Sequence, residues 1–329
     1  MSKIRIAIVG YGNLGRGVES AIAQNADMEL VAMFTRRDPS TVKLQKSPAP
    51  VCAYDDLPQW QGKIDVMILC GGSATDLVEQ SPYVAQWFNI IDSYDNHSQI
   101  PEYFAKIDEV AQKNATVALI SVGWDPGLLS VQRMYNTCIL PQGQTYTFWG
   151  KGVSQGHSDA VRRVQSVLDA RQYTIPIDSA LEQVRQGENP QLSPGQRHRR
   201  ECFVVAEAGA DLEKISQEIK SMPGYFVEYE TTVHFISAQE LAEEHGDLPH
   251  GGRVIHSALT GFDLEHKQRV EFAIALDSNP EFTASVIVAH ARAVQRLSAQ
   301  GQKGAFTIFD IAPGLLSPES PEELRRKYL

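Results

Sequence analysis

Three glycines near the N-terminus have the spacing that a dinucleotide-binding turn requires. Gly10, Gly12 and Gly15 form a G-x-G-x-x-G run between the apolar segment 3–9 and a stretch with helical spacing of apolar residues. In this setting the glycines permit a tight turn, let the backbone approach a pyrophosphate, and let helix and strand pack closely. The helix N-terminus adds free amides and a positive dipole. A glycine-rich turn without a ligand is the alternative, but it does not explain all three glycines in this place.

The end of the next apolar segment indicates which dinucleotide would bind. NAD sites usually carry Asp or Glu about twenty residues after the glycines, where the carboxylate holds the ribose hydroxyls. Here segment 29–34 is followed by Thr35, Arg36 and Arg37. Two guanidinium groups match the geometry and charge of a 2′-phosphate, so the sequence predicts NADP as the cofactor. The alternative is a solvated basic turn beside Asp38.

Two further predicted strand ends carry carboxylates. Asp95 lies in the run I-D-S-Y-D-N-H (91–97), and Asp125 lies in S-V-G-W-D-P-G (121–127). Paired carboxylates at this edge can bind a substrate ammonium or take part in proton transfer. The alternatives are a helix cap for Asp125, with Pro126 as the first helical residue, and a loop turn for Asp95.

Small residues follow another strand. The run Cys70-Gly71-Gly72-Ser73 would let a ligand approach the backbone at a carboxyl strand end, although a plain turn is the alternative. Cys70 has no nearby partner in the sequence that would activate its thiol.

Alternating strands and helices must position these groups at one edge of a sheet. The apolar patterns predict strands at 3–9, 29–34, 65–70, 88–92 and 116–122, and helices after Gly12, at 75–87 and at 101–114. This order predicts an α/β fold with a doubly wound, Rossmann-type parallel sheet.

The pattern changes after Pro126. Segments 145–149, 201–206, 225–236, 253–259 and 269–276 have mostly alternating polarity, and only two helical stretches, 179–186 and 211–222, interrupt them. Segment 186–197 is predicted to be an exposed loop, and 283–300 a long amphipathic helix. We therefore predict a dinucleotide-binding domain at 1–122 and a second α+β domain at 123–296, built on a mainly antiparallel sheet, for substrate binding and dimerisation. The C-terminal segment 297–329 is predicted to pack back on the first domain.

Composition excludes several other classes. Among 329 residues, forty acidic and thirty basic side chains give a net charge of −10, which opposes a role in binding nucleic acid. No run approaches the roughly 18 apolar residues of a membrane helix. The four cysteines lie far apart without a C-x-x-C pair, so we expect no metal site, no disulfide framework and a cytoplasmic location.

Over nearly its whole length the sequence resembles the meso-diaminopimelate D-dehydrogenases. The resemblance rests on 7–16, 92–97 and 123–127, and on F-W-G (148–150), S-Q-G-H-S-D-A (154–160), P-H-G-G (249–252) and Asn279-Pro280. It implies NADP-dependent, reversible oxidative deamination at the D-centre of meso-2,6-diaminopimelate, which gives L-2-amino-6-oxopimelate and ammonia in diaminopimelate and lysine biosynthesis. It also implies a homodimer.

The resemblance assigns site residues by motif. It implies cofactor contacts at Tyr11, Gly12, Asn13, Leu14, Thr35, Arg36, Arg37, Cys70, Gly71, Gly72, Ser73, Ser93, Tyr94, Asp95, Val122, Gly123, Trp124, Asp125 and Pro126. It implies substrate contacts at Asp95, Asp125, Trp149, Gln155, Gly156, Thr174, Arg200, His250 and Asn279. The family often has serine at Thr35 and methionine at Gly71, and both departures are mild.

The chemistry of these residues suits a substrate with two amino acid ends. Arg200, His250 and Thr174 can bind a carboxylate, and Asn279 can add neutral donors. Asp95 and Asp125 can bind the ammonium, and either can be the catalytic group that moves a proton. Without the resemblance, Arg200 would be interpreted as a solvated charge.

Two other functions remain open at this stage. The first is another NADP oxidoreductase on the same plan, such as a sugar dehydrogenase that uses a catalytic lysine. Lys151 is the nearest candidate, and its surroundings in the sequence do not support it. The second is a non-catalytic NADP sensor.

Overall fold

The computed structural model describes residues 3–73 and 75–329. Two compact units are formed, one from Met1–Val131 with Pro280–Leu329 and the other from Gln132–Asn279. We call them unit 1 and unit 2. The sequence-based boundaries at 122 and 297 differ from these because the N-terminal turn of α4 (Leu128–Ile139) and most of α10 (Asn279–Ala299) belong to unit 1 by their contacts.

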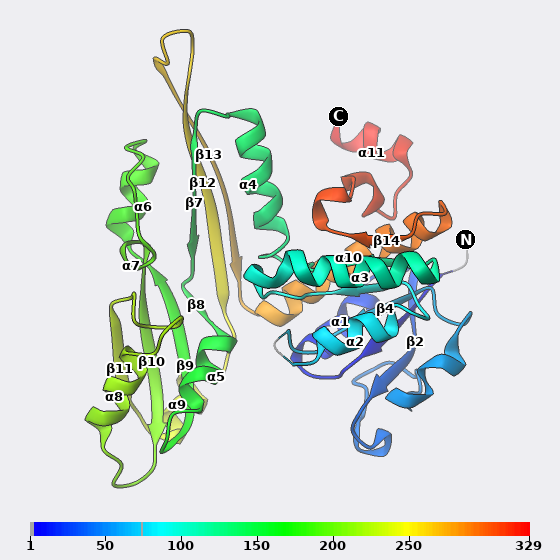
Figure 1. Ribbon diagram of the computed structural model, residues 1–329, viewed down its shortest axis with the longest axis horizontal. Helices are drawn as coiled ribbons and strands as arrows, with labels where there is room; N and C mark the ends of the chain where they lie inside the picture. The colour runs from blue at the N-terminus through cyan, green and yellow to red at the C-terminus, as the bar shows by residue number, and fades with distance from the viewer. Residues whose placement is uncertain (1–2, 74) are drawn as a thin grey trace. The chain divides into compact units, whose positions relative to one another are not determined.

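The sheet of unit 1 has seven strands within the described residues, and all their pairings are parallel (Figure 1). The spatial order is β14-β6-β5-β4-β1-β2-β3. The strands are β1 (Ile4–Val9), β2 (Met28–Thr35), β3 (Val51–Ala53), β4 (Val66–Leu69), β5 (Ile90–Asp92), β6 (Val117–Leu119) and β14 (Gly304–Phe306). The order reverses between β1 and β4, so the Gly-rich turn after β1 lies at the switch point where such sheets bind ligands.

Helices cover both faces of this sheet, which explains why its strands are almost entirely apolar. The helices are α1 (Asn13–Ala23), α2 (Leu77–Val84), α3 (Ile100–Asn114) and α10 (Asn279–Ala299), with α11 (Pro321–Tyr328) near the C-terminus. Side chains of α1 and α10 share one buried cluster with β1, and side chains of α2 and α3 share another. The predicted doubly wound sheet is therefore confirmed.

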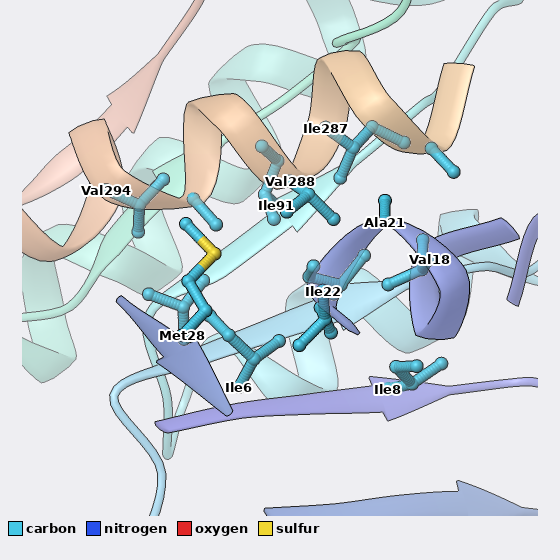
Figure 2. Close-up of a cluster of buried hydrophobic side chains, with 14 of the residues drawn as sticks. Ile6, Ile8, Val18, Ala21, Ile22, Met28, Ile91, Ile287, Val288 and Val294 are labelled. Carbon is cyan, nitrogen blue, oxygen red and sulfur yellow. The ribbon is translucent and has the colours of Figure 1, made fainter. Parts of the chain in front are cut away.

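The long helix α10 is part of the core of unit 1. Figure 2 shows Ile287, Val288 and Val294 of α10 directed toward the cluster formed by Ile22 and other side chains of α1, β1 and β2. The buried Arg292 adds an ion pair, with 2.6 Å between its Nε and Oδ2 of Asp27 before β2.

Unit 2 contains two sheets, and all but one of the strand pairings described there are antiparallel. One sheet has the order β11-β10-β9-β8 and the other β13-β12-β7. The strands are β7 (Gln144–Trp149), β8 (Gly152–Val153), β9 (Val167–Pro176), β10 (His198–Ala206), β11 (Thr231–Phe235), β12 (His250–Thr260) and β13 (His266–Leu276). The predicted α+β class with a mainly antiparallel sheet is confirmed.

Several local predictions for the second half were wrong. The described helices there are α4 (Leu128–Ile139), α5 (Gln155–Arg162), α6 (Asp178–Arg185), α7 (Pro194–Arg197), α8 (Leu212–Lys220) and α9 (Ala238–Glu244), more than the two expected. The missed helices are mostly short, and Ser154, Ser193 and Ser237 cap α5, α7 and α9. Helix α7 occupies the end of the predicted loop 186–197.

The predicted strand 225–236 is also wrong in its first half. The carbonyl of Met222 accepts hydrogen bonds from the amides of Tyr225, Phe226 and Val227, which forms turns instead. Phe226 fills the core of unit 2 from this turn, so its apolar character reflects packing and not a strand.

Candidate active site

The Gly-rich turn of unit 1 has the shape that a pyrophosphate requires. Gly10 has a φ of 89°, in the left-handed region. A Cβ on Gly15 would lie 2.3 Å from the carbonyl oxygen of Gly10, so the helix packs directly on the turn. A Cβ on Gly12 would meet no atom within 4 Å, which leaves open space at the N-terminus of α1. No acidic residue occupies the first turn of this helix. These features fit a bound dinucleotide.

The two arginines after β2 lie next to this turn. Arg37 donates through Nη2 to the Tyr11 carbonyl at 3.2 Å, and its amide donates to Oγ1 of the buried Thr35 at 3.1 Å. Arg36 has a side chain that is 60% exposed, and it pairs with Asp76 before α2. An exposed guanidinium held by one carboxylate can exchange that partner for a phosphate.

A hydrogen bond joins the loops that follow β4 and β5. The amide of Asp95 donates to Oγ of Ser73 at 3.1 Å, and the amide of Gly72 donates to Oδ2 of Asp76 at 3.0 Å. The structure thus brings the C-G-G-S run beside the loop that carries Asp95. Burial raises the pKa of the Cys70 thiol, so this cysteine is a poor nucleophile.

The two candidate carboxylates differ in exposure. Asp95 is exposed, and Asp125 is half-buried after the buried Trp124. Helix α4 begins at Leu128, so Pro126 is not its first residue. Asp125 is therefore not the N-cap of a helix that starts at Pro126, which was the alternative interpretation of its place in the sequence. Nearby, the fully buried Asp92 accepts hydrogen bonds from both loops.

The sequence reasoning missed Glu19, which organises the other side of the turn. This buried carboxylate accepts a hydrogen bond from the Tyr11 hydroxyl. It also accepts the backbone amides of Gln45, Lys46 and Ser47, at 2.7–3.0 Å. Burial works against its charge, but these hydrogen bonds hold the pKa of the Glu19 carboxyl below its usual value. A glutamate on the apolar face of α1, eight residues after Tyr11, was the available signal.

In unit 2, Arg200 and Thr174 face each other across β10 and β9. They are register partners, and Nη1 of Arg200 donates to the Thr174 hydroxyl. Arg200 is only 7% exposed, and its guanidinium carbon lies 4.0 Å from the ring centre of Tyr229. The adjoining Arg199 is instead exposed, and its Nη2 lies 3.5 Å from Oε1 of Glu201.

Arg200 is a buried cation without an acidic partner among the described residues. Its Nε has no hydrogen-bond partner there, and the side chains that act on the pKa of its guanidinium, Tyr229 and Cys202, are not carboxylates. Burial lowers the pKa of the guanidinium, which still remains charged at neutral pH. A buried charge normally has a counter-charge, so this arrangement is suited to an anionic ligand such as a carboxylate.

Close glycine packing gathers two more predicted residues of unit 2, Trp149 and His250, around Thr174. Gly150 follows Trp149, and a Cβ on it would lie 2.1 Å from the Thr174 carbonyl oxygen. A Cβ on Gly152 would lie 2.5 Å from His250. Substitution at either glycine would push these strands apart, so the F-W-G-K-G run serves to bring Trp149, Thr174 and His250 together.

His198, which the sequence reasoning also missed, supports Trp149. Its Nε2 accepts the Trp149 amide at 2.8 Å, and the two rings stack with 5.3 Å between centres. Burial, with Arg200 and Arg197 nearby, lowers the pKa of His198 to about 3. The imidazole is therefore neutral at neutral pH, as an acceptor must be.

The remaining predicted residues lie at two helix starts. Gln155 and Gly156 are the first residues of α5, both exposed, and no atom lies within 4 Å of a Cβ on Gly156. Ser154, which caps this helix, donates its amide to the Gln172 carbonyl of β9. Asn279 begins α10, and its amide donates to Leu248 at 3.0 Å.

Within residues 3–73 and 75–329, no group of three His, Cys, Asp or Glu side chains could hold a metal ion. Within the same ranges, no helix combines the length and the apolar character needed to cross a membrane.

The parallel sheet, with its glycine turn at the switch point, places the chain in the class of dinucleotide-binding α/β proteins. Comparison with known proteins narrows this class. The model of the diaminopimelic acid dehydrogenase C-terminal domain matches residues 123–278. The meso-diaminopimelate D-dehydrogenase of Ureibacillus thermosphaericus is 62% identical over 329 residues, which cover 100% of both chains. The chain belongs to the meso-diaminopimelate D-dehydrogenase family.

Solved structures agree with this assignment. The diaminopimelate dehydrogenase of Corynebacterium glutamicum in complex with diaminopimelate is 47% identical, with a TM-score of 0.93 and 100% of both chains covered. An engineered D-amino acid dehydrogenase bound to NADP+ is 45% identical, with a TM-score of 0.88 and the same coverage.

Proposed function

We propose that this protein catalyses the reversible, NADP-dependent oxidative deamination of meso-2,6-diaminopimelate at its D-centre. The products are L-2-amino-6-oxopimelate and ammonia, in diaminopimelate and lysine biosynthesis. One structural observation carries the proposal: Arg200 is a buried cation with no acidic partner in the described chain, as the carboxylate of an amino acid substrate requires. Family membership over the full chain supports the particular substrate.

The cofactor that we propose is NADP, which accepts the hydride when it is bound. Gly12 and the start of α1 would hold the pyrophosphate, and Arg36 and Arg37 the 2′-phosphate. The loops Cys70–Ser73, Ser93–Asp95 and Val122–Pro126 would complete the contacts, because they follow β4, β5 and β6 at the same edge of the sheet.

In unit 2 we propose that Arg200, Thr174 and His250 bind a substrate carboxylate. Trp149 would form an apolar wall, kept in place by His198. Gln155, Gly156 and Asn279 would add amide donors at the starts of α5 and α10. These residues orient the substrate, and orientation can supply much of the rate in such a reaction.

In unit 1 we propose that Asp95 and Asp125 act on the reacting amine. The ammonium must lose a proton before the carbon gives up its hydride, and a carboxylate can bind the ammonium and then accept that proton. Water then adds to the imine, and ammonia leaves. The two carboxylates are both candidates for the proton transfer.

We further propose that unit 1 is the dinucleotide-binding unit, that unit 2 binds substrate and forms a homodimer, and that the enzyme is cytoplasmic.

The proposed reaction is tested by NADPH absorbance with purified protein, NADP and meso-diaminopimelate. Parallel reactions contain the LL isomer, D-alanine, or NAD in place of NADP. We expect absorbance to grow only with the meso isomer and NADP. NADP binding without any turnover would favour the sensor, and turnover of a different substrate would favour another oxidoreductase.

The choice of NADP is tested separately with Arg36→Ala. Loss of one charge-assisted hydrogen bond, worth roughly 1.5–3 kcal/mol, should raise the KM for NADP about tenfold or more and leave the KM for NAD nearly unchanged. Lys113→Ala removes the same charge from an exposed position at the end of α3 and is the control. Equal effects on the two cofactors would contradict the assignment of Arg36 to the 2′-phosphate.

A further inference from the structure

Asp92, the last residue of β5, is a fully buried carboxylate for which the proposed mechanism has no use. Its Oδ2 accepts hydrogen bonds from the Ser81 hydroxyl at 2.9 Å and the Tyr103 hydroxyl at 2.6 Å. Its Oδ1 accepts the backbone amides of Tyr94 at 3.1 Å and Ser121 at 3.0 Å. The two oxygens thus have separate tasks: one contacts helices, and the other contacts loops.

The two amides bound by Oδ1 belong to the loops that carry Asp95 and Asp125. Tyr94 directly precedes Asp95, and Ser121 begins the run that leads to Asp125. The backbone carbonyl of Asp92 also accepts the Val122 amide at 2.9 Å. Asp92 therefore connects the first turns of two loops, and Ser121 in the second loop lies 29 residues after Asp92 in the chain.

The Ser121 backbone shows why such a tie is needed. Ser121 has a φ of 58°, a left-handed conformation that non-glycine residues adopt only when the surroundings favour it. The hydrogen bond to Asp92 supplies such a contact at this residue. On the other loop, Tyr94 is buried and stacks on Tyr103 with 3.9 Å between ring centres, so it carries the same network into α3.

We propose that Asp92 is a positioning residue for the reaction: its Oδ1 fixes the loops of Asp95 and Asp125 relative to each other. This inference rests on the proposed function. It extends that function by naming a residue that touches neither substrate nor cofactor and acts through the backbone of those that do. A carboxylate is suited to this role because its two oxygens can accept four hydrogen bonds at once.

The test compares three substitutions. Asp92→Ala removes the tie, and we expect kcat/KM for meso-diaminopimelate to fall at least tenfold. Asp92→Asn keeps an Oδ1 for both amides, while the Ser81 and Tyr103 hydroxyls can rotate to accept from its Nδ2, so activity should stay within threefold of wild type. Tyr103→Phe removes one partner of Oδ2 only and should also stay within threefold. If Asp92→Ala does not fold, Asp92→Ser replaces it, because its shorter hydroxyl cannot hold both amides.

A purely structural role is separated by a control and by a second readout. Met28→Ala creates a cavity at the start of β2, away from the carboxyl strand ends, and should lower the melting temperature without lowering kcat/KM. Amide hydrogen exchange of Tyr94 and Ser121 should accelerate at least tenfold in Asp92→Ala and stay slow in Asp92→Asn. Wild-type kcat/KM in Asp92→Ala, or an equal loss in Met28→Ala, would overturn the inference.

Failure of the proposed function would look different. Wild-type protein would then show no turnover of meso-diaminopimelate, yet exchange of the two amides needs no substrate. Unchanged exchange in Asp92→Ala would show that Asp92 does not hold the loops, and the inference would fall on that result alone.

Discussion

Unit 1 buries Asp92 and unit 2 buries Arg200 next to predicted site residues, but the surroundings of the two side chains differ. In unit 1, both oxygens of Asp92 have two hydrogen-bond partners each. In unit 2, Arg200 has the Thr174 hydroxyl and the Tyr229 ring as neighbours, while its Nε has no partner among the described residues. Asp92 is completed by the chain itself, and Arg200 is not.

This difference separates a buried group whose hydrogen bonds stabilise the fold from a buried group that a ligand would pair. Removing one partner of a satisfied buried charge leaves the other groups unpaired, which usually costs several kcal/mol of stability. A buried charge that is already unsatisfied costs stability in the free protein, and a ligand that completes it gains that energy on binding. The comparison predicts that removing the buried group lowers stability in unit 1 but not in unit 2, although activity should fall in both cases.

The largest expected effect is on the activity of Arg200→Leu. Loss of a desolvated guanidinium that binds a carboxylate costs about 3 kcal/mol or more, so kcat/KM for meso-diaminopimelate should fall at least a hundredfold. The melting temperature should stay the same or rise, because a hydrophobic residue replaces an uncompensated buried charge. Steady-state kinetics and thermal unfolding of the same sample measure both.

The adjoining arginine supplies the control for this variant. Arg199→Leu changes the same residue type on the exposed side of β10 and should leave both kcat/KM and melting nearly unchanged. If Arg200→Leu instead unfolds the protein while Arg199→Leu does not, Arg200 belongs with Asp92 as a group that the fold requires, and the contrast between the units fails.

The next effect concerns Glu19, a second buried acid of unit 1 whose partners are all supplied by the chain. Glu19→Ala leaves the amides of residues 45–47 without their acceptor, and we expect it to cost about 3 kcal/mol of stability. Glu19→Gln keeps one acceptor oxygen and should cost less. Thermal unfolding measures this loss of stability. The control is Glu29→Ala at an exposed position of β2, which should change the free energy of unfolding by no more than about 0.5 kcal/mol. A small loss in Glu19→Ala would show that a complete set of partners does not by itself stabilise unit 1.

The sequence predicted the fold of unit 1 well and that of unit 2 less well, for a physical reason. Strands such as β1 and β4 are buried on both faces, so they appear as continuous apolar runs. Strand β9 was missed because Asp169, Arg171 and Gln172 interrupt its apolar residues, and it is held by eleven pairings along β8 and β10 that no local pattern reveals.

The site was predictable where a motif carries it and not where contacts cross the chain. The glycine run could be recognised because the backbone of the turn requires it, and the two arginines could be recognised because they follow the second strand, where such folds discriminate between cofactors. Asp92 was visible as a strand-end acid, but its role depends on Ser121, and no pattern in the sequence joins them. His198 likewise gained its role from Trp149, 49 residues away. Such long-range pairs arise from packing.

Acidification should affect the two buried groups Asp92 and His198 in opposite ways. Burial raises the pKa of Asp92, so the folded protein binds its proton more readily than the unfolded chain and loses no stability there as pH falls. Burial lowers the pKa of His198 to about 3, against 6.5 for an exposed histidine. The stability that neutral His198 contributes is complete above pH 6.5 and is lost as pH falls toward 3. The loss amounts to about 2 kcal/mol at pH 5.

This pH effect is measured by thermal unfolding between pH 7.5 and 5. His198→Asn keeps an acceptor for the Trp149 amide and should flatten the pH dependence, whereas the exposed His266→Asn should not change it. His157, whose pKa burial lowers to about 4, adds a loss of the same sign in unit 2. An unchanged pH dependence in His198→Asn would mean that His198 is not held neutral by the fold.

The smallest expected effect concerns Gln172 and tests whether an unpaired buried amide of unit 2 binds a ligand, as Arg200 is proposed to do. Gln172 lies on β9, two residues before Thr174 and opposite Cys202, and its buried amide has no hydrogen-bond partner among the described residues. Alternate residues of a strand share a face, so Gln172 points to the same side of the sheet as Thr174. If this amide only costs stability, Gln172→Met should raise the free energy of unfolding by about 1 kcal/mol and leave kcat/KM within threefold. The exposed Gln217→Met on α8 should change neither. A raised KM for meso-diaminopimelate would instead place Gln172 with Arg200, because its amide would then be completed by the substrate and not by the chain.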